Sequence, residues 1–194
     1  KGQYHMGIKF PTLTPIKNPE LKVINVTKEN FQTNSSRNYD KAKELFLEGY
    51  TCCQAVVAAF ADEPWFVDSG LTLETACKLA SSFGGGMGRL REVCGAVSGM
   101  FMISGLAQGF AEKKSPEKAE HYQRIQDLAA AFKKENGSII CRELLGLDKG
   151  NQTTVSGDAF ASTPEERTAE YYKKRPCPEI CKQAADIIEQ FLEK

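Results

Sequence analysis

Apolar and polar positions along residues 40–60 follow the period of an α-helix. Small or apolar residues recur three and four positions apart, which places them on one helix face. Asp40 stands at the predicted start, and Pro64 marks the predicted end because proline cannot continue a helix. The pattern predicts one long helix whose buried face carries these residues: Ala42, Leu45, Phe46, Gly49, Cys52, Cys53, Val56, Val57 and Phe60.

Three later segments show the same period with recognisable start and stop residues. Thr72 is a favoured N-cap residue and predicts a helix that ends at the glycine run of residues 84–86. A stretch of small residues predicts a closely packed helix that begins near Cys94. Residues 115–134 predict a charged helix, and Gly137 is a residue typical of the position after a helix end.

Shorter patterns predict the remaining segments. Residues 138–146 predict a short helix, and the chain from about Pro178 predicts the last one, with its apolar residues on one face. Residues 163–166 have the composition of a helical turn. The aromatic residues 65–66 are expected in a loop that covers the core.

The chain divides into an N-terminal arm and a helical domain. Residues 1–37 are rich in Pro, Asn, Thr and Lys without a helical period, which predicts an extended arm, and residues 1–5 have the character of an expression-vector remnant. Residues 38–194 are expected to form one cysteine-containing redox domain. Because no segment shows the alternation typical of strands, we predict an all-α fold, a single-domain bundle of about five to six helices.

Charge and hydropathy exclude several classes of protein. The 25 Lys and Arg residues balance 25 Asp and Glu residues, and no basic stripe indicates nucleic-acid binding. No apolar run approaches the roughly 18–20 residues of a membrane span, and no signal-peptide pattern is visible at the start. We therefore expect a cytoplasmic protein without a nucleic-acid or membrane partner.

Seven cysteines are the most informative chemical groups of the chain. In a chain of this size without an export signal, thiols more often bind metals or take part in redox chemistry than form structural disulfides. Cys94, Cys141 and Cys177 stand at predicted helix starts, where the helix dipole favours a thiolate. The chain has two histidines, His5 and His121, which disfavours a multi-histidine metal site.

A glycine-rich loop surrounds Cys94. Glycine tolerates positive φ and lets backbones approach closely, so these residues predict a supporting loop with room for a cofactor beside the thiol. Arg89 and Arg91 flank the cysteine loop and are expected as solvated surface, with support of a thiolate or an anionic ligand as the alternative. The supporting loop comprises Gly84, Gly85, Gly86, Gly95 and Gly99.

The other cysteines carry weaker signals. Cys52 lies in the middle of the first predicted helix and faces the core, while its neighbour Cys53 is expected to pack. Cys77 lies on the buried stripe of the second predicted helix and is also expected to be structural. Cys181 follows Cys177 by one turn, which leaves open a ligand pair or one functional thiol beside a core residue.

In one shared order, four stretches resemble the C_GCAxxG_C_C family, which is described as redox-active. They are Glu48–Val56, the glycine run with Cys94–Gly99, Cys141–Gly146, and Cys177 followed by Ala184 and Ala185. The resemblance implies that the shared cysteines of the family are Cys52, Cys94, Cys141 and Cys177, and it leaves out Cys53, Cys77 and Cys181. The family is also similar to part of the split-Soret cytochromes, but this chain lacks their haem motif, and we expect no haem.

Four thiols from four separate segments predict a site assembled between helices. Four thiolates suit an iron–sulfur cluster or a tetrahedral zinc ion, and the wide spacing disfavours a structural zinc. We expect an iron–sulfur cluster in either an oxidoreductase or an electron-transfer component. A thiol–disulfide redox protein that uses the same cysteines is the first alternative, and a non-redox helical binding or scaffold module is the second.

The sequence also predicts two kinds of protein partner, a second copy of the chain and a redox partner. The extended arm and the small-residue helix that begins near Cys94 predict a homodimer, and a redox function implies a redox partner protein. The sequence contains no nucleotide-binding or hydrolytic motif and names no substrate.

Overall fold

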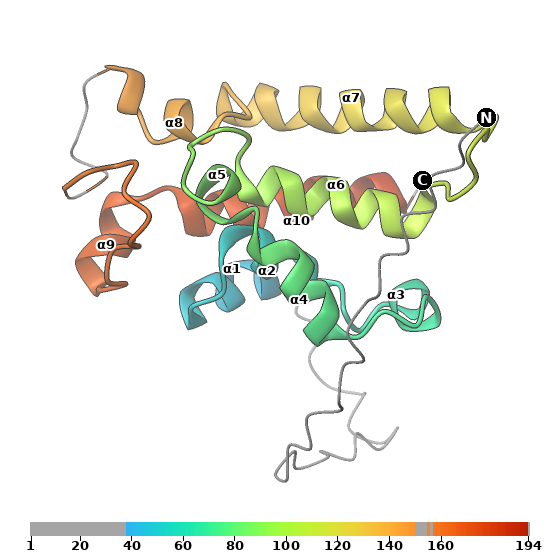
Figure 1. The fold of residues 1–194 in the computed structure, drawn as a ribbon, viewed down its shortest axis with the longest axis horizontal. Helices are drawn as coiled ribbons and strands as arrows, with labels where there is room; N and C mark the ends of the chain where they lie inside the picture. The colour runs from blue at the N-terminus through green and yellow to red at the C-terminus, as the bar shows by residue number, and fades with distance from the viewer. Residues whose placement is uncertain (1–37, 150–154, 156, 194) are drawn as a thin grey trace, which may run out of the picture. The chain divides into compact units, whose positions relative to one another are not determined.

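The computed structural model describes residues 38–149, residue 155 and residues 157–193 (Figure 1). The predicted arm of residues 1–37, with the suggested remnant at residues 1–5, lies outside the described residues. Within the described part the chain is helical and contains no β-strand, so the prediction of an all-α bundle is confirmed. None of the helices described combines the length and the apolar character that crossing a membrane requires.

The helices fall into a long set and a short set. The long helices are α1 (Asn38–Glu48), α2 (Cys52–Ala59), α4 (Leu73–Ser81), α6 (Gly95–Gln108), α7 (Lys118–Asn136) and α10 (Cys177–Leu192). The short ones are α3 (Pro64–Asp68), α5 (Gly84–Met87), α8 (Cys141–Leu144), a 3₁₀ turn at Leu147–Lys149 and α9 (Ala169–Lys174).

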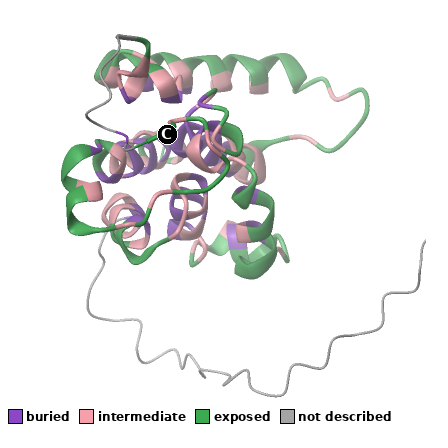
Figure 2. Cartoon of the chain, turned by 60° about the vertical axis from the view of Figure 1, so that its left-hand side comes forward, coloured by how far each residue is buried: buried purple, intermediate pink, exposed green. Residues whose placement is uncertain are grey.

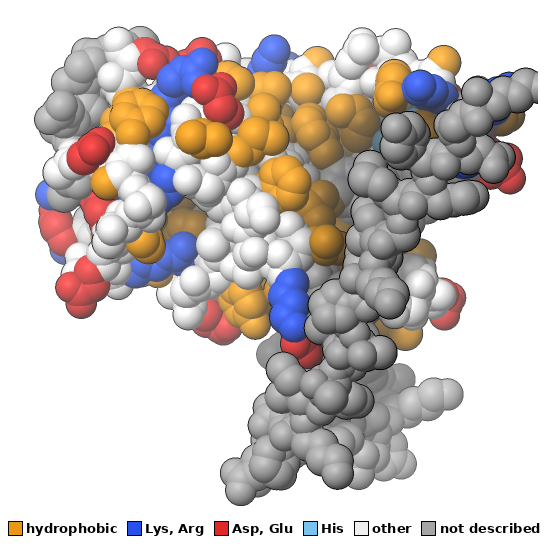
Figure 3. All heavy atoms as spheres, in the orientation of Figure 1, with side chains coloured by type: hydrophobic (Ala, Val, Ile, Leu, Met, Phe, Trp, Pro, Cys, Tyr) orange, Lys and Arg blue, Asp and Glu red, His pale blue; other side chains and the backbone are white. Residues whose placement is uncertain are grey.

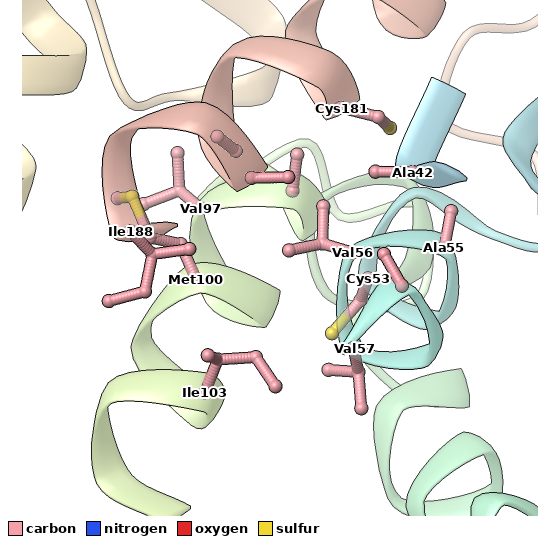
Figure 4. Packing of buried hydrophobic residues seen from close by; sticks show 14 of the residues in the cluster. Ala42, Cys53, Ala55, Val56, Val57, Val97, Met100, Ile103, Cys181 and Ile188 are labelled. Atoms are coloured by element: carbon pink, nitrogen blue, oxygen red, sulfur yellow. The ribbon is translucent and has the colours of Figure 1, made fainter. Parts of the chain in front are cut away.

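Helix α10 lies at the centre of the bundle and contacts α1, α2, α6 and α7 (Figure 1). Apolar side chains of α2, α6 and α10 meet in the core, where Val56, Met100 and Ile188 are fully buried (Figure 4). Buried residues gather where the helices face one another, whereas α7 is mostly exposed and buries only Leu128 and Phe132 (Figure 2). The core therefore fixes α10 against α2 and α6, and the N-terminal ends of these three helices meet at one cavity.

The single long helix predicted over residues 40–60 is wrong, because the chain breaks between α1 and α2. Gly49 takes a φ of +117°, a conformation that favours glycine, and it ends α1. Thr51 then caps α2, since its side chain accepts from the Gln54 N–H while the Gln54 side chain accepts from the Thr51 N–H. The break makes Cys52 the first residue of a helix rather than a mid-helix residue.

Two other local predictions are also wrong. Pro64 begins α3 at the first-turn position that proline favours, so residues 65–66 are helical, and Phe66 is buried. Residues 163–166 form no helix, and Thr168 instead caps α9 by accepting from the Tyr171 N–H. The predicted cap at Thr72 and the predicted stop at Gly137 are confirmed.

Candidate functional site

One cavity of about 240 Å³ is lined by Cys52, Cys94, Cys141 and Cys177. Each of these cysteines stands where a helix begins. Cys52, Cys141 and Cys177 are the first residues of α2, α8 and α10, and Cys94 immediately precedes α6. The fold thus directs four helix starts and four thiols to one place.

Backbone hydrogen bonds join the segment before α6 to the segment before α8. The Cys94 N–H donates to the Ile139 carbonyl at 2.8 Å, and the Cys141 N–H donates to the Glu92 carbonyl at 2.6 Å. Val93 and Ile140 form an antiparallel bridge between these bonds. Cys94 and Cys141, far apart in the sequence, are therefore held on neighbouring backbone.

Two glycines allow the cysteines to approach the loop. A Cβ on Gly95 would lie 2.4 Å from the Cys52 Sγ and 2.7 Å from the Phe83 carbonyl oxygen. Gly86 has a φ of +75°, and a Cβ there would lie 2.6 Å from the Cβ of Cys141. Any side chain at either position would displace a cysteine that lines the cavity.

The other glycines of the supporting loop are also tightly constrained. A Cβ on Gly84 would lie 2.9 Å from the Cβ of Thr51, and one on Gly99 would lie 2.9 Å from the Cβ of Val56. Gly85 has a φ of +66°. The loop therefore needs glycine for close packing against α2 and for its left-handed turns.

The same loop also carries residues with positive φ that are not glycine. Met87, Arg89 and Arg91 have φ values of 60°, 68° and 61°. Such conformations are uncommon for residues with a Cβ and persist where the surrounding structure holds them. Arg91 is held by its Nε, which donates to the Ala159 carbonyl at 2.8 Å.

Loss of hydration dominates the electrostatics of the thiols. It raises the pKa of Cys177 to about 12, and it also raises the pKa of Cys94 and of Cys141, with the nearby Cys52 thiol adding to each shift. The Ala96 N–H in the first turn of α6 opposes the rise at Cys94. The expectation that helix starts lower these pKa values is therefore wrong for the metal-free chain, because desolvation outweighs the helix dipole.

Four arginines share the cavity with the cysteines: Arg89, Arg91, Arg167 and Arg175. The expectation of solvated surface is wrong for Arg91, which is only 1% exposed, and Arg89 is half-buried. Arg91 and Arg175 lower the pKa of Cys141 and of Cys177. The cavity positions of Arg167 and Arg175 were not predicted from the sequence, where Arg175 is marked only by lying two residues before Cys177.

Cys53, Cys77 and Cys181 do not line the cavity. Cys53 and Cys181 are buried in the core, and Figure 4 shows both among apolar side chains. The Cys181 thiol lies 3.8 Å from the Cys52 carbonyl oxygen, and Cys77 is half-buried on α4. Cys181 is therefore a core residue, which decides the alternative that its spacing from Cys177 left open.

All seven cysteines are free thiols. Within the described part of the chain, no three His, Cys, Asp or Glu side chains are arranged to hold one metal ion. A tetrahedral zinc with bonds near 2.3 Å would bring its sulfurs to about 3.8 Å from one another. The four thiols are instead distributed around the cavity. His121 does not line it and packs edge-on against Phe110, with a ring-centroid distance of 5.7 Å.

On the face shown in Figure 3, Lys and Arg side chains are interspersed with carboxylates and apolar groups, without a continuous basic surface. This face therefore offers no basic surface of the kind that nucleic-acid binding requires.

Comparison with known protein families identifies a match. The family model described as "Putative redox-active protein (C_GCAxxG_C_C)" matches residues 50–191. No curated protein and no solved structure matches the chain. The matched segment covers more than half of the chain and contains all four cysteines that line the cavity. The chain therefore belongs to the C_GCAxxG_C_C family.

Proposed function

We propose that Cys52, Cys94, Cys141 and Cys177 hold an iron–sulfur cluster and that the protein transfers electrons through it. The observation that carries the proposal is that these four thiols, from four different elements, line one cavity. Cysteine thiolates are the usual ligands of such clusters.

The residues present fit a cluster better than a single ion. Iron and sulfide atoms lie between the cysteines of a cluster, so its ligand sulfurs stand farther apart than those around one zinc. This agrees with thiols spread around a cavity of about 240 Å³ and with no arrangement for a single metal ion among the described residues. The N–H groups at the adjoining helix starts are suitable donors to sulfur.

The charged groups of the cavity also support the proposal. Ligand thiols must lose their protons, and the raised pKa values of Cys94 and Cys177 oppose this in the metal-free chain. The positive charges of Arg91 and Arg175 favour the deprotonated thiols. When bound, the cluster supplies one-electron redox chemistry, and the protein enclosing the cysteines limits contact with water.

Disulfide cycling with the same cysteines is the second candidate, and the convergence of the thiols is the observation that favours it. It requires a thiolate to attack a disulfide sulfur, and raised pKa values make the thiolate scarce at neutral pH. A non-redox scaffold is less compatible still, because a packing core gains nothing from the buried charge of Arg91.

The test is anaerobic purification followed by an absorption spectrum and assays of iron and sulfide. We expect iron and sulfide in stoichiometric amounts in the native sequence and their loss in Cys94→Ala. Cys77→Ala is the matched control, because Cys77 is a half-buried thiol that does not line the cavity, and this variant should keep both. A colourless protein that takes up no iron on anaerobic reconstitution would contradict the proposal and favour disulfide cycling.

A further inference from the structure

The positive charge around the cavity is only partly neutralised. Arg175 is paired with the carboxylate of Glu165. Arg89, Arg91 and Arg167 form no salt bridge within the described part of the chain, and each donates to backbone carbonyl oxygens. A carbonyl satisfies an N–H group but does not cancel the charge of a guanidinium. Among the described residues that line the cavity, Glu165 is the one carboxylate, and it acts on Arg89 as well as on Arg175, so four guanidinium groups share a single negative charge.

These guanidinium groups are held in place by the fold. The Arg167 Nη1 donates to the carbonyl of Phe46 at 3.0 Å and to that of Tyr50 at 2.8 Å. Arg89 donates through its Nε to the Ala161 carbonyl. Two segments far apart in the sequence, the loop between α5 and α6 and the chain around α9, thus present fixed cations to one cavity. Fixed donors bind an anion at a lower entropic cost than mobile side chains do.

Two buried guanidinium nitrogens lack a hydrogen-bond partner among the described residues. They are the Nη2 of Arg91 and the Nε of Arg175. Both residues line the cavity and are nine-tenths or more buried, with exposures of 1% and 6%. Buried cationic donors are normally paired, so each of these nitrogens indicates a partner that the described protein atoms do not supply.

The arginines act unequally on the thiols. Arg91 and Arg175 are the ones that lower the pKa of Cys141 and of Cys177. Arg89 has a lowered pKa, caused by desolvation and by the positive charge of Arg91. Thiolates at the proposed cluster site would take up part of the charge of Arg91 and Arg175. All four arginines would therefore serve an anion in the metal-free chain, and mainly Arg89 and Arg167 in the iron-loaded protein.

We propose that this cavity binds a small oxyanion, with a carboxylate, phosphate or sulfate group held by Arg89, Arg91, Arg167 and Arg175. The planar guanidinium group matches the oxygen pairs of all three. The cavity of about 240 Å³ lies below the roughly 300–1,000 Å³ of sites for drug-sized ligands, so the ligand is small. The inference goes beyond the proposed function, because binding the anion depends on the arginines and not on a cluster.

The test is titration calorimetry of the full chain with phosphate, sulfate or malonate, with ionic strength held constant by sodium chloride. It is done on the reduced metal-free protein and on the iron-loaded protein. We expect saturable binding of at least one oxyanion, weakened about tenfold in Arg89→Gln and in Arg167→Gln, since each removes a charge-assisted hydrogen bond. Comparison of the three affinities shows whether the cavity prefers tetrahedral anions, such as phosphate and sulfate, or carboxylates, such as malonate.

The matched control is Arg124→Gln. Arg124 pairs with Glu120 on α7 and does not line the cavity, so its loss should leave the affinity unchanged. Circular dichroism confirms that each variant is folded. Where a glutamine variant does not fold, the lysine substitution replaces it, and weaker binding is again expected because lysine lacks the two-pronged donor geometry.

Heat that is not saturable, or equal affinity in the native sequence and both cavity variants, would overturn the inference. Arginine-dependent oxyanion binding without iron uptake would support it and contradict the cluster. Iron uptake without oxyanion binding would support the cluster and overturn the anion site.

Discussion

At the residue scale, the arginines that line the cavity are the side chains whose positions sequence patterns predict least well. The glycines around Cys94 were recognisable because a glycine run beside a cysteine indicates a tight loop. The burial of Arg91 was not, because its partner carbonyl at Ala159 is contributed by a segment far along the chain. Local patterns contain no information about such long-range contacts.

Gly95 provides a sharp test of the tight approach to Cys52. In Gly95→Ala the new Cβ would lie 2.4 Å from the Cys52 Sγ, and we expect a loss of about 1–3 kcal/mol in the free energy of unfolding, as for overpacked cores. Urea denaturation measures the loss. Gly105→Ala, in the same helix with nothing within 4 Å of its Cβ, should instead be neutral or stabilising. Equal effects at both positions would refute the steric argument.

The pKa of Cys177 leads to a pH prediction for the metal-free protein. The folded chain raises this pKa from 9.0 to about 12, so the folded state retains a proton that the unfolded state releases. The stability that this provides is present below pH 9 and declines as the pH rises from 9 towards 12. Urea midpoints at pH 8, 9 and 10 should fall, and the fall should be shallower in Cys177→Ala. An identical slope in both proteins would argue against a raised pKa.

At the element scale, helices with clear caps were predictable and the break after α1 was not. Thr72 and Gly137 mark their helix ends because their chemistry is local. Residues 40–60 keep the same apolar period before and after the break, so the period does not reveal the break. Thr51 and Gln54, however, have the spacing of a capping box. The loop predicted after Pro64 was wrong because proline has two meanings in a sequence: it ends helices, and it also occupies their first turn.

Thr51 connects a helix cap to the candidate site. Thr51→Ala removes the capping box immediately before Cys52, and we expect a loss of about 1 kcal/mol in the free energy of unfolding together with weaker iron retention. Thr72→Ala removes the comparable cap of α4, away from the cavity, and should cost similar stability while iron retention stays normal. Iron release measured against a chelator separates the two effects. Equal iron loss in both variants would show that general destabilisation is responsible.

At the scale of the whole molecule, the bundle converts distant sequence positions into one cavity. The family resemblance selected the four cysteines, and the fold supplied what no linear pattern contains, namely the four arginines beside them. The all-α class was predictable from period alone, whereas the cavity depends on how α10 packs between α1, α2, α6 and α7.

The predicted homodimer is tested at this scale by sedimentation. We expect a mass twice the 21.4 kDa of one chain, as the sequence patterns of residues 1–37 and of the small-residue segment after Cys94 predict. Removal of residues 1–37 should shift the mass towards that of one chain if the arm is responsible. A mass of 21.4 kDa for the full chain would contradict the prediction.

Helix α10 begins at Cys177 and contacts α1, α2, α6 and α7. If Cys177 binds the proposed cluster, loss of the cluster would remove a bond from the first turn of this central helix, and the folded population would fall. Cellular proteases continuously remove proteins in proportion to that loss. The abundance of this protein would then follow the supply of iron at a constant rate of synthesis, so that starvation for the metal shortens its lifetime without any separate sensor.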